Sequence, residues 1–157
     1  MNHRFSILRR AFAVTLLSLP LVAFAQDRGS REEAKAMVEA AIGHIGKAGA
    51  DQAFKDFADK GNAAWHKKDL YVFVIRKDGT MLSHGANEKL VGKNQTPLKD
   101  PNGKAFVQEM LEVTKKAEGG WVDYDWASPA TRKIEGKASF VKPAASIDAF
   151  VGVGVYR

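Results

Sequence analysis

The sequence has 157 residues, no cysteine, and 24 basic against 18 acidic residues, which gives a formal net charge of +6. This length fits a single domain. Without cysteine the chain can form neither a disulfide nor a thiolate zinc site, so its core has to supply the stability. Basic residues after residue 25 are interspersed with acidic ones. That pattern is typical of an ordinary solvated surface and argues against nucleic acid as a partner.

The first 25 residues have the features of an export signal. Three arginines give a basic start, and residues 11–25 are an apolar run that contains one proline and ends in Ala-Phe-Ala. An uncleaved membrane anchor is the alternative, but a spanning helix needs about 20 apolar residues. We therefore expect cleavage after Ala25 and a periplasmic domain over residues 26–157 that does not span the membrane. Loss of the three arginines leaves 21 basic residues and a charge of +3.

Residues 69–85 predict two strands joined by a tight turn. Leu70 to Ile75 is an unbroken β-branched and aromatic run, which is typical of a strand covered on both faces. Asp78-Gly79 supplies the turn, because glycine accepts the positive φ that short hairpin loops demand. A central strand buried on both sides predicts a layer on each face, and one such layer can enclose a small-molecule cavity.

The remaining elements follow from helical and strand periodicity. A capping box at Ser30 and Glu33 starts a first helix that should run to about Ile45. The other predicted elements are helices over residues 51–59 and 105–118 and strands over residues 121–126, 132–141 and 148–156. Together these elements predict an α+β fold with a five-stranded antiparallel sheet. The long N-terminal helix should cover one face, and a lid with a short helix over residues 85–103 should cover the other.

Several sequence blocks resemble one known family, the single Cache domain, type 2. The blocks are Asp69-Leu-Tyr-Val-Phe-Val, Asp78-Gly-Thr-Met-Leu-Ser-His-Gly85, Leu90-Val-Gly-Lys-Asn94, Leu98-Lys-Asp-Pro-Asn-Gly-Lys104, Gly120-Trp-Val-Asp-Tyr-Asp-Trp126, Lys137-Ala-Ser-Phe-Val141 and Val151-Gly-Val-Gly-Val-Tyr156. The resemblance implies a PAS-like extracytoplasmic sensor domain that binds small ligands, often short organic acids, in a pocket over the sheet. It implies no catalysis.

Two departures from the family pattern bear on these expectations. Receptor members continue into a cytoplasmic signalling part, whereas this sequence ends at Arg157 after the last predicted strand. We therefore expect a stand-alone periplasmic member, which could deliver its solute to a membrane receptor or kinase or could simply sequester it. Phe140 stands where family members often carry tyrosine, which removes any hydrogen bond from that position.

Five residues are candidates for the ligand pocket. Phe73, Tyr124 and Trp126 could form its walls, and alternation places the last two on one face of their strand. His84 as a donor and Lys137 as a point charge could meet a carboxylate. Structural roles stay open: Phe73 as core, His84 as a satisfied structural histidine, and Lys137 as a solvated strand lysine.

Catalytic and metal sites find little support. Ser83 and His84 are adjacent on a strand, so they should point to opposite faces and cannot act as nucleophile and base. No cofactor is expected, and the histidines lack zinc-ligand spacing. Residues 98–109 partly match a calcium loop, but Leu98 offers no oxygen at the first ligand position. A turn stabilised by the Asp and Asn side chains is expected there instead.

Two functions therefore remain open. The first is a periplasmic domain that binds a small solute such as a short organic acid. The alternative is a non-enzymatic interaction or scaffold module, whose pocket is filled by its own side chains and whose surface exposes an apolar patch. The first helix could also pair with its copy in a homodimer.

Overall fold

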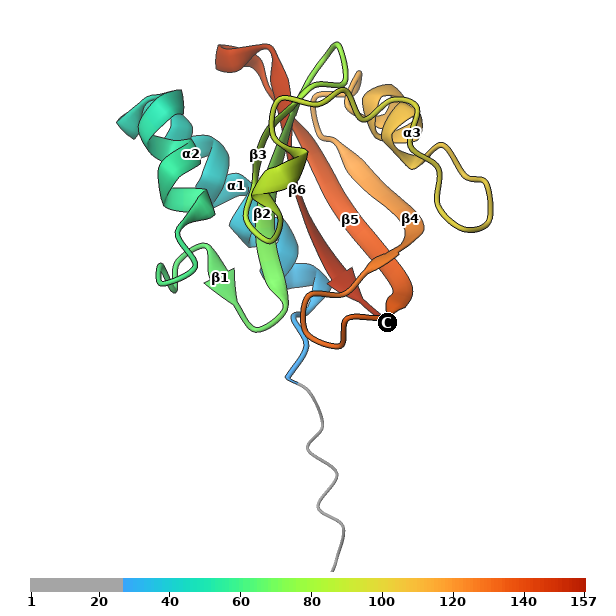
Figure 1. Cartoon of the computed structure of the whole chain (residues 1–157). Helices are drawn as coiled ribbons and strands as arrows, with labels where there is room; N and C mark the ends of the chain where they lie inside the picture. Colours follow the sequence, from blue (N-terminus) through green and yellow to red (C-terminus); the bar gives the residue numbers. More distant parts are fainter. Residues whose placement is uncertain (1–26) are drawn as a thin grey trace, which may run out of the picture.

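The computed structural model of the chain describes residues 27–157, so the predicted signal peptide lies outside the described residues. The elements are α1 (Arg31–Ala48), α2 (Ala50–Ala58), β1 (His66–Lys67), β2 (Leu70–Arg76), β3 (Met81–His84), the 3₁₀ helix η1 (Glu88–Leu90), α3 (Phe106–Val113), β4 (Gly120–Ala127), β5 (Ile134–Ala144), the 3₁₀ helix η2 (Ala145–Ile147) and β6 (Ala149–Tyr156). In Figure 1, α1 runs behind the sheet, and α3 lies in front with the chain that leads to it. Over these residues, no helix has the length and apolar character that a bilayer span requires.

The sheet is antiparallel throughout. Its order is β1-β2-β6-β5-β4, and β3 also pairs with β2. The two-residue β1 is the one strand that the sequence pattern did not predict. The α+β class and the antiparallel sheet are confirmed, with five longer strands and this short sixth one. β2 therefore lies between β6 on one side and the short strands β1 and β3 on the other.

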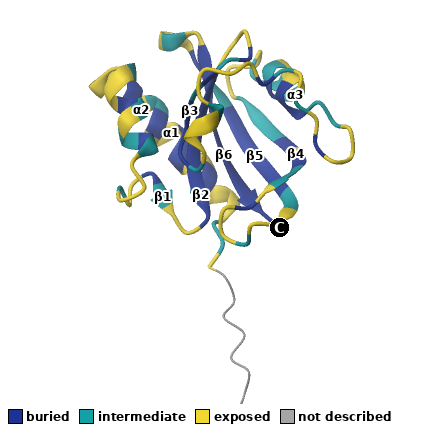
Figure 2. Ribbon diagram, viewed as in Figure 1, coloured by how far each residue is buried: buried dark blue, intermediate teal, exposed yellow. Residues whose placement is uncertain are grey.

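Alternation along the strands divides the core into two layers. The layer beneath α1 and α2 is formed by Ala34, Met37, Val38, Ala41, Ile45, Ala53, Phe57, Trp65, Leu70, Val72, Val74, Ala138, Phe140, Ala144, Ala149, Val151, Val153 and Val155. The opposite layer is formed by Tyr71, Phe73, Ile75, Met81, Phe106, Val107, Met110, Val122, Tyr124, Val141, Phe150 and Tyr156. All residues from Leu70 to Ile75 are buried, which confirms the strand covered on both faces. Figure 2 shows this buried centre and the more exposed helices and loops around it.

Helix α1 begins at the predicted capping box. The Ser30 hydroxyl accepts a hydrogen bond from the Glu33 amide at 3.1 Å, and the Glu33 carboxylate accepts one from the Ser30 amide at 2.9 Å. The helix continues past Gly46, where we expected the chain to loosen, and ends at Ala48. Gly49 ends it because its φ of 82° lies in the region that favours glycine.

Helix α3 is shorter than predicted. It ends at Val113 rather than near residue 118. The Thr114 hydroxyl donates to the Leu111 carbonyl at 3.2 Å and so satisfies an acceptor at the helix end. Gly119, at φ 69°, then passes so close to the backbone of Val141 that any side chain there would overlap it. The chain that follows the helix thus packs closely against β5, a contact that helical periodicity could not show.

Strand β5 is longer than predicted. It continues to Ala144, and its last residues pair with the first residues of β6. β4 pairs with β5 only as far as Val141, so Pro143 lies where β5 has one partner strand. A proline is tolerated in such an edge position because the ladder there does not need its amide.

The segment between β3 and α3, residues 85–105, is called the covering segment below. Asp100 organises its second half: one carboxylate oxygen accepts from the amides of Asn102 and Lys104, both at 2.9 Å, and the other accepts from the Asp125 amide of β4 at 3.2 Å. The stretch that partly matched a calcium loop is thus a turn fastened to the sheet. Among the described residues, no group of three or more His, Asp or Glu could hold a metal ion.

Candidate ligand-binding site

A cavity lies between the sheet and the layer formed by α3 and the covering segment. Its volume is about 20 Å³, which is room for about one water molecule. Its lining consists of Tyr71, Phe73, Ile75, Met81, His84, Gln95, Leu98, Phe106, Val107, Met110, Tyr124, Trp126 and Lys137. Any larger occupant has to displace side chains or the covering segment.

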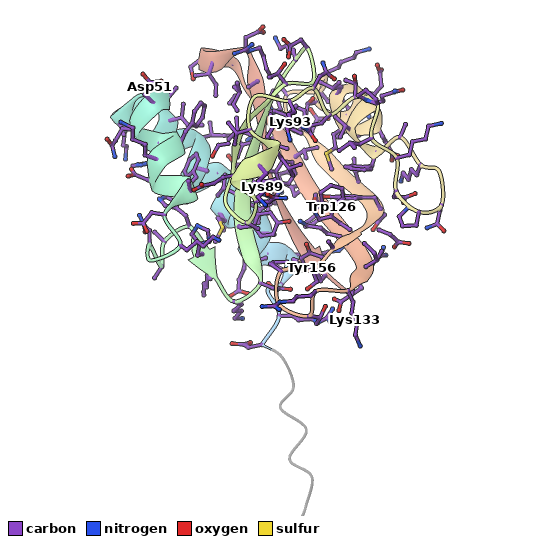
Figure 3. All side chains as sticks on the ribbon, in the orientation of Figure 1. Asp51, Lys89, Lys93, Trp126, Lys133 and Tyr156 are labelled. Carbon is purple, nitrogen blue, oxygen red and sulfur yellow. The ribbon has the colours of Figure 1, made fainter. Side chains whose placement is uncertain are left out.

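All five residues that the sequence indicated line this cavity. Phe73 comes from β2 and His84 from β3, where the two residues face each other across the ladder. Tyr124 and Trp126 come from β4, and Tyr124 is paired with Lys137 of β5. Figure 3 labels Trp126 among the side chains drawn on the sheet. Four strands thus bring together residues that are up to 64 positions apart, from Phe73 to Lys137.

Lys137 is the charged group of the cavity. The residue is 1% exposed, and its Nζ donates a hydrogen bond to the Tyr71 hydroxyl at 2.6 Å. Nζ also lies 4.1 Å from the Tyr71 ring centroid and 4.8 Å from that of Tyr156, where the ring faces favour a cation. Within residues 27–157 no carboxylate pairs with it. Burial lowers the pKa of Lys137 to about 7, although the negative charge of Asp69 acts in the opposite direction.

His84 is held as a neutral donor. Its Nδ1 accepts hydrogen bonds from the backbone amides of Asn87 at 2.9 Å and Ala86 at 3.3 Å. In the neutral ring the hydrogen must therefore sit on Nε2. Burial, and next the positive charge of Lys137, lower the pKa of His84 to about 3.

A directed chain of hydrogen bonds leads away from Lys137. The Tyr156 hydroxyl donates to the Ala127 carbonyl at 2.8 Å, so its single hydrogen is used there. In the 3.2 Å contact between the Tyr71 and Tyr156 hydroxyls, Tyr71 is consequently the donor. The Tyr71 oxygen is then free to accept from Lys137. Burial raises the pKa of both tyrosines, so both hydroxyls keep their hydrogens.

Aromatic rings close the cavity on the β4 side. Phe106 of α3 stacks on Tyr124 at a centroid distance of 4.4 Å and an interplanar angle of 4°. The same ring meets Trp126 edge-on at 5.4 Å. The Tyr124 hydroxyl has its own partner, the Ser139 hydroxyl at 3.0 Å. The stacked rings of Phe106 and Tyr124 thus form an apolar wall, and the Tyr124 hydroxyl is satisfied by Ser139.

Two glycines of β6 make room for the site. A Cβ at Gly152 would overlap the Phe73 ring, and one at Gly154 would overlap the Lys137 stem and the Ser139 hydroxyl. Two side chains that line the cavity, Phe73 and Lys137, thus approach the backbone of β6 closely at these glycines. Phe140 is not among those side chains: it lies beneath α1, where its ring is 5.4 Å from that of Trp121. Tyrosine at that position would not reach the cavity.

Sequence reasoning missed Tyr71 and Tyr156. Tyr71 lies two residues before Phe73 on β2, and Tyr156 lies two residues after Gly154 on β6, so strand alternation carried the signal. Gln95, Leu98 and Met110 were missed for other reasons. Gln95 and Leu98 belong to the covering segment, and no pattern shows which residues of a loop turn inward. Met110 lies on the buried face of α3, and the sequence does not show that this face packs over the cavity.

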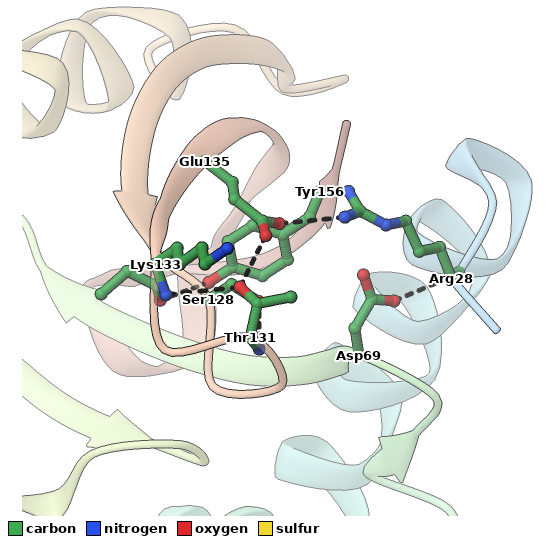
Figure 4. A network of polar contacts seen from close by, with 9 residues as sticks. Arg28, Asp69, Ser128, Thr131, Lys133, Glu135 and Tyr156 are labelled. Carbon is green, nitrogen blue, oxygen red and sulfur yellow. Dashed lines mark hydrogen bonds and ion pairs between the residues drawn. The ribbon is translucent and has the colours of Figure 1, made fainter. Parts of the chain in front are cut away.

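A second polar cluster lies beside the Tyr156 end of the hydrogen-bond chain (Figure 4). Arg28 pairs with Glu135 of β5 at 3.1 Å, and the Gly29 amide donates to Asp69 at 2.6 Å. These contacts tie the residues before α1 to the start of β2 and to β5. Asp69 thereby holds a negative charge near the cavity without pairing with Lys137.

Comparisons with known proteins identify the family. The family model of the single Cache domain 2 matches residues 14–157. The sensor histidine kinase MctS of Rhizobium johnstonii is 38% identical over 89 residues, which are 57% of this chain and 19% of the kinase. The methyl-accepting chemotaxis protein McpP of Pseudomonas putida is 28% identical over 88 residues, which are 56% of this chain and 16% of that protein. This chain therefore covers less than a fifth of the length of each of these two relatives.

A solved structure supports the same assignment. A Cache chemosensory domain, described for its recognition of carboxylic acids, superimposes with a TM-score of 0.63 and 25% sequence identity, covering 80% of this chain and 86% of that one. Fold and sequence agree: the chain belongs to the single Cache domain 2 family, the sensor domains of chemotaxis receptors and histidine kinases.

Proposed function

We propose that this chain is a periplasmic sensor domain that binds a short monocarboxylate in the cavity over the sheet. One observation carries the proposal: Lys137 is buried and has no carboxylate partner within residues 27–157. A buried charge is costly unless it is paired, so such a lysine is favoured where a ligand supplies the opposite charge. The ligand carboxylate would sit against Nζ and complete the pair.

The other cavity residues suit the rest of such a ligand. His84 offers its Nε2 hydrogen to an oxygen of the ligand. Phe73, Tyr124 and Trp126 would contact the alkyl part, as apolar pocket walls usually do. Among the described residues that line the cavity, Lys137 is the one with a cationic side chain. A single charge favours acids with one carboxylate, because a second carboxylate would remain buried without a partner.

The relatives support a sensing role. Both matched proteins are signalling proteins, a sensor histidine kinase and a chemotaxis receptor, and the structural neighbour is described as recognising carboxylic acids. Family membership likewise supports a role without catalysis. We propose a membrane receptor or kinase as the partner that responds to the bound solute.

One observation favours the scaffold alternative. With room for about one water molecule, the cavity as it stands does not hold an organic acid, as expected for a pocket filled by its own side chains. That alternative also needs an apolar docking patch. The described residues expose two large apolar side chains, Val91 in the covering segment and Ile134 at the start of β5. The apolar surface available to a partner is therefore small, which favours the sensor.

A thermal-shift titration with acetate, propionate and malate tests the proposal. A monocarboxylate that binds the folded state raises the melting temperature in proportion to the logarithm of its concentration, and malate should do so less. Lys137→Met should abolish the shift. The matched control is Lys142→Met on the same strand, whose Nζ pairs at the surface with Glu39 and which should respond like the wild type. No shift with any of the three acids would overturn the proposal.

A further inference from the structure

Within residues 27–157, no side chain forms an ion pair with Lys137 Nζ that would fix its charge. Neutral groups face it from every strand around the cavity: Tyr71 and Phe73 from β2, His84 from β3, Tyr124 and Trp126 from β4, and Tyr156 from β6. α3 adds Phe106, and the covering segment adds the amide Gln95. The one carboxylate that acts on Nζ, Asp69, lies outside the cavity lining and is bonded to the Gly29 amide.

The hydrogen bonds at this position fit either protonation state of the amine. The Tyr71 oxygen needs one donor, and both an ammonium group and a neutral amine can provide it. The direction of the chain through Tyr156 to the Ala127 carbonyl stays the same in both cases. Loss of the proton from Nζ therefore breaks no hydrogen bond in the protein and removes an unpaired charge from its interior, although it also removes the attraction of the cation to the rings of Tyr71 and Tyr156.

We propose that the cavity takes up one proton together with each carboxylate, and that Lys137 Nζ receives it. This inference rests on the proposed function. In the ligand-free protein near or above neutral pH the amine is largely neutral, in keeping with the pKa of about 7 that burial gives it. An arriving carboxylate stabilises the ammonium form, so the amine is protonated as the acid binds. The acid anion and the proton enter together, and the cavity contains a neutral ion pair.

A specific pH dependence follows. Once the pH exceeds the pKa of the free amine, apparent affinity should fall by about tenfold for each further pH unit, because each binding event then consumes one proton. Below that pKa the amine is already charged, so affinity should level off. His84 adds no step in this range, since its pKa of about 3 keeps it neutral. Occupancy of the site would therefore depend both on the concentration of the carboxylate and on the pH.

Calorimetric titration with acetate measures the proton directly. At about pH 8.5, the heat of binding in phosphate, HEPES and Tris should vary with the ionisation enthalpy of the buffer, with a slope near one proton taken up. At about pH 6 the slope should be near zero. Lys142→Met should match the wild type. Lys137→Arg carries a fixed charge, so any affinity that it retains should show no uptake at either pH.

The outcomes separate the two proposals. Binding of acetate with no proton uptake at the higher pH would overturn this inference and leave the proposed function standing. Absence of acetate binding at both pH values, together with no thermal shift from propionate or malate, would overturn both proposals. NMR titration of the lysine side chains in the ligand-free wild type adds a test that needs no variant: one lysine should titrate near neutral pH and disappear in Lys137→Met. A Lys137 that stays charged up to about pH 10 would also overturn the inference.

Discussion

Replacing Lys137 by methionine should make the protein more stable while it removes the ligand site. Burial lowers the pKa of this lysine from its ordinary value of 10.5 to about 7. At about 1.4 kcal/mol for each pKa unit, the charged form costs the folded state roughly 5 kcal/mol relative to the unfolded chain. Methionine has a similar length and no charge, so the variant avoids this cost.

The net gain is smaller because one contact is lost. The bond from Nζ to the Tyr71 hydroxyl, at 2.6 Å, contributes about 1.5–3 kcal/mol as a hydrogen bond to a charged group. At about pH 6 we therefore expect Lys137→Met to unfold with a free energy roughly 2–4 kcal/mol higher than the wild type. A gain in stability at the expense of binding is typical of residues kept for function.

The pH dependence has a definite sign. Below the folded-state pKa of about 7, Lys137 is charged in both states and the cost is constant. As the pH rises from there toward 10.5, the folded state loses its proton first, so the wild type gains stability. The advantage of the variant should thus shrink by roughly 3 kcal/mol between about pH 7 and pH 9.

Urea denaturation at several pH values measures these differences. The control Lys142→Met removes a surface pair with Glu39 and should change the unfolding free energy by less than about 1 kcal/mol at every pH. A Lys137→Met variant less stable than the wild type at about pH 6 would refute the reasoning. The lysine would then be a structural element of the core, and its lack of a counter-charge would carry no functional meaning.

Three further predictions concern the neighbours of this lysine. Gly154→Ala places a methyl group against the Lys137 stem, so it should lower the unfolding free energy by about 1–3 kcal/mol and weaken acetate binding. The control is Gly43→Ala in α1, where no atom lies within 4 Å of the added methyl group. It should raise the unfolding free energy by about 0.5–1 kcal/mol and leave acetate binding unchanged. Equal effects of the two would contradict the packing described. The His84 ring should stay neutral with its hydrogen on Nε2 down to about pH 4 in ¹⁵N NMR spectra, and a charged ring at about pH 6 would be inconsistent with its burial. Tyr156→Phe removes the donor to a backbone carbonyl and should cost about 1 kcal/mol in urea denaturation, and no loss would show that this carbonyl is satisfied by another group.

The sequence predicted the sheet well because alternation and burial are local signals. The apolar run from Leu70 to Ile75 identified a strand covered on both faces. Alternation on the β4 strand placed Tyr124 and Trp126 together, and both line the cavity. Which residue lies opposite Lys137 in the sheet depends on the register of the strands. The turns and the hydrophobic pattern of a sequence specify that register only in part.

What the sequence did not predict depends on contacts between distant segments. After α3, the chain brings Gly119 against the backbone of Val141 on β5. The role of Tyr71 needs both the Tyr156 hydroxyl and Lys137 Nζ, which come from two other strands. The size of the cavity depends on how the covering segment packs, and loop packing leaves no periodic trace in a sequence.

A crystal structure of the protein grown with acetate would test the central claim most directly. The account predicts a carboxylate oxygen about 2.7–3.2 Å from Lys137 Nζ, with His84 Nε2 at hydrogen-bonding distance and the aromatic walls moved outward to make room. A cavity unchanged in volume, or acetate bound elsewhere with Lys137 still bonded to Tyr71 alone, would contradict it.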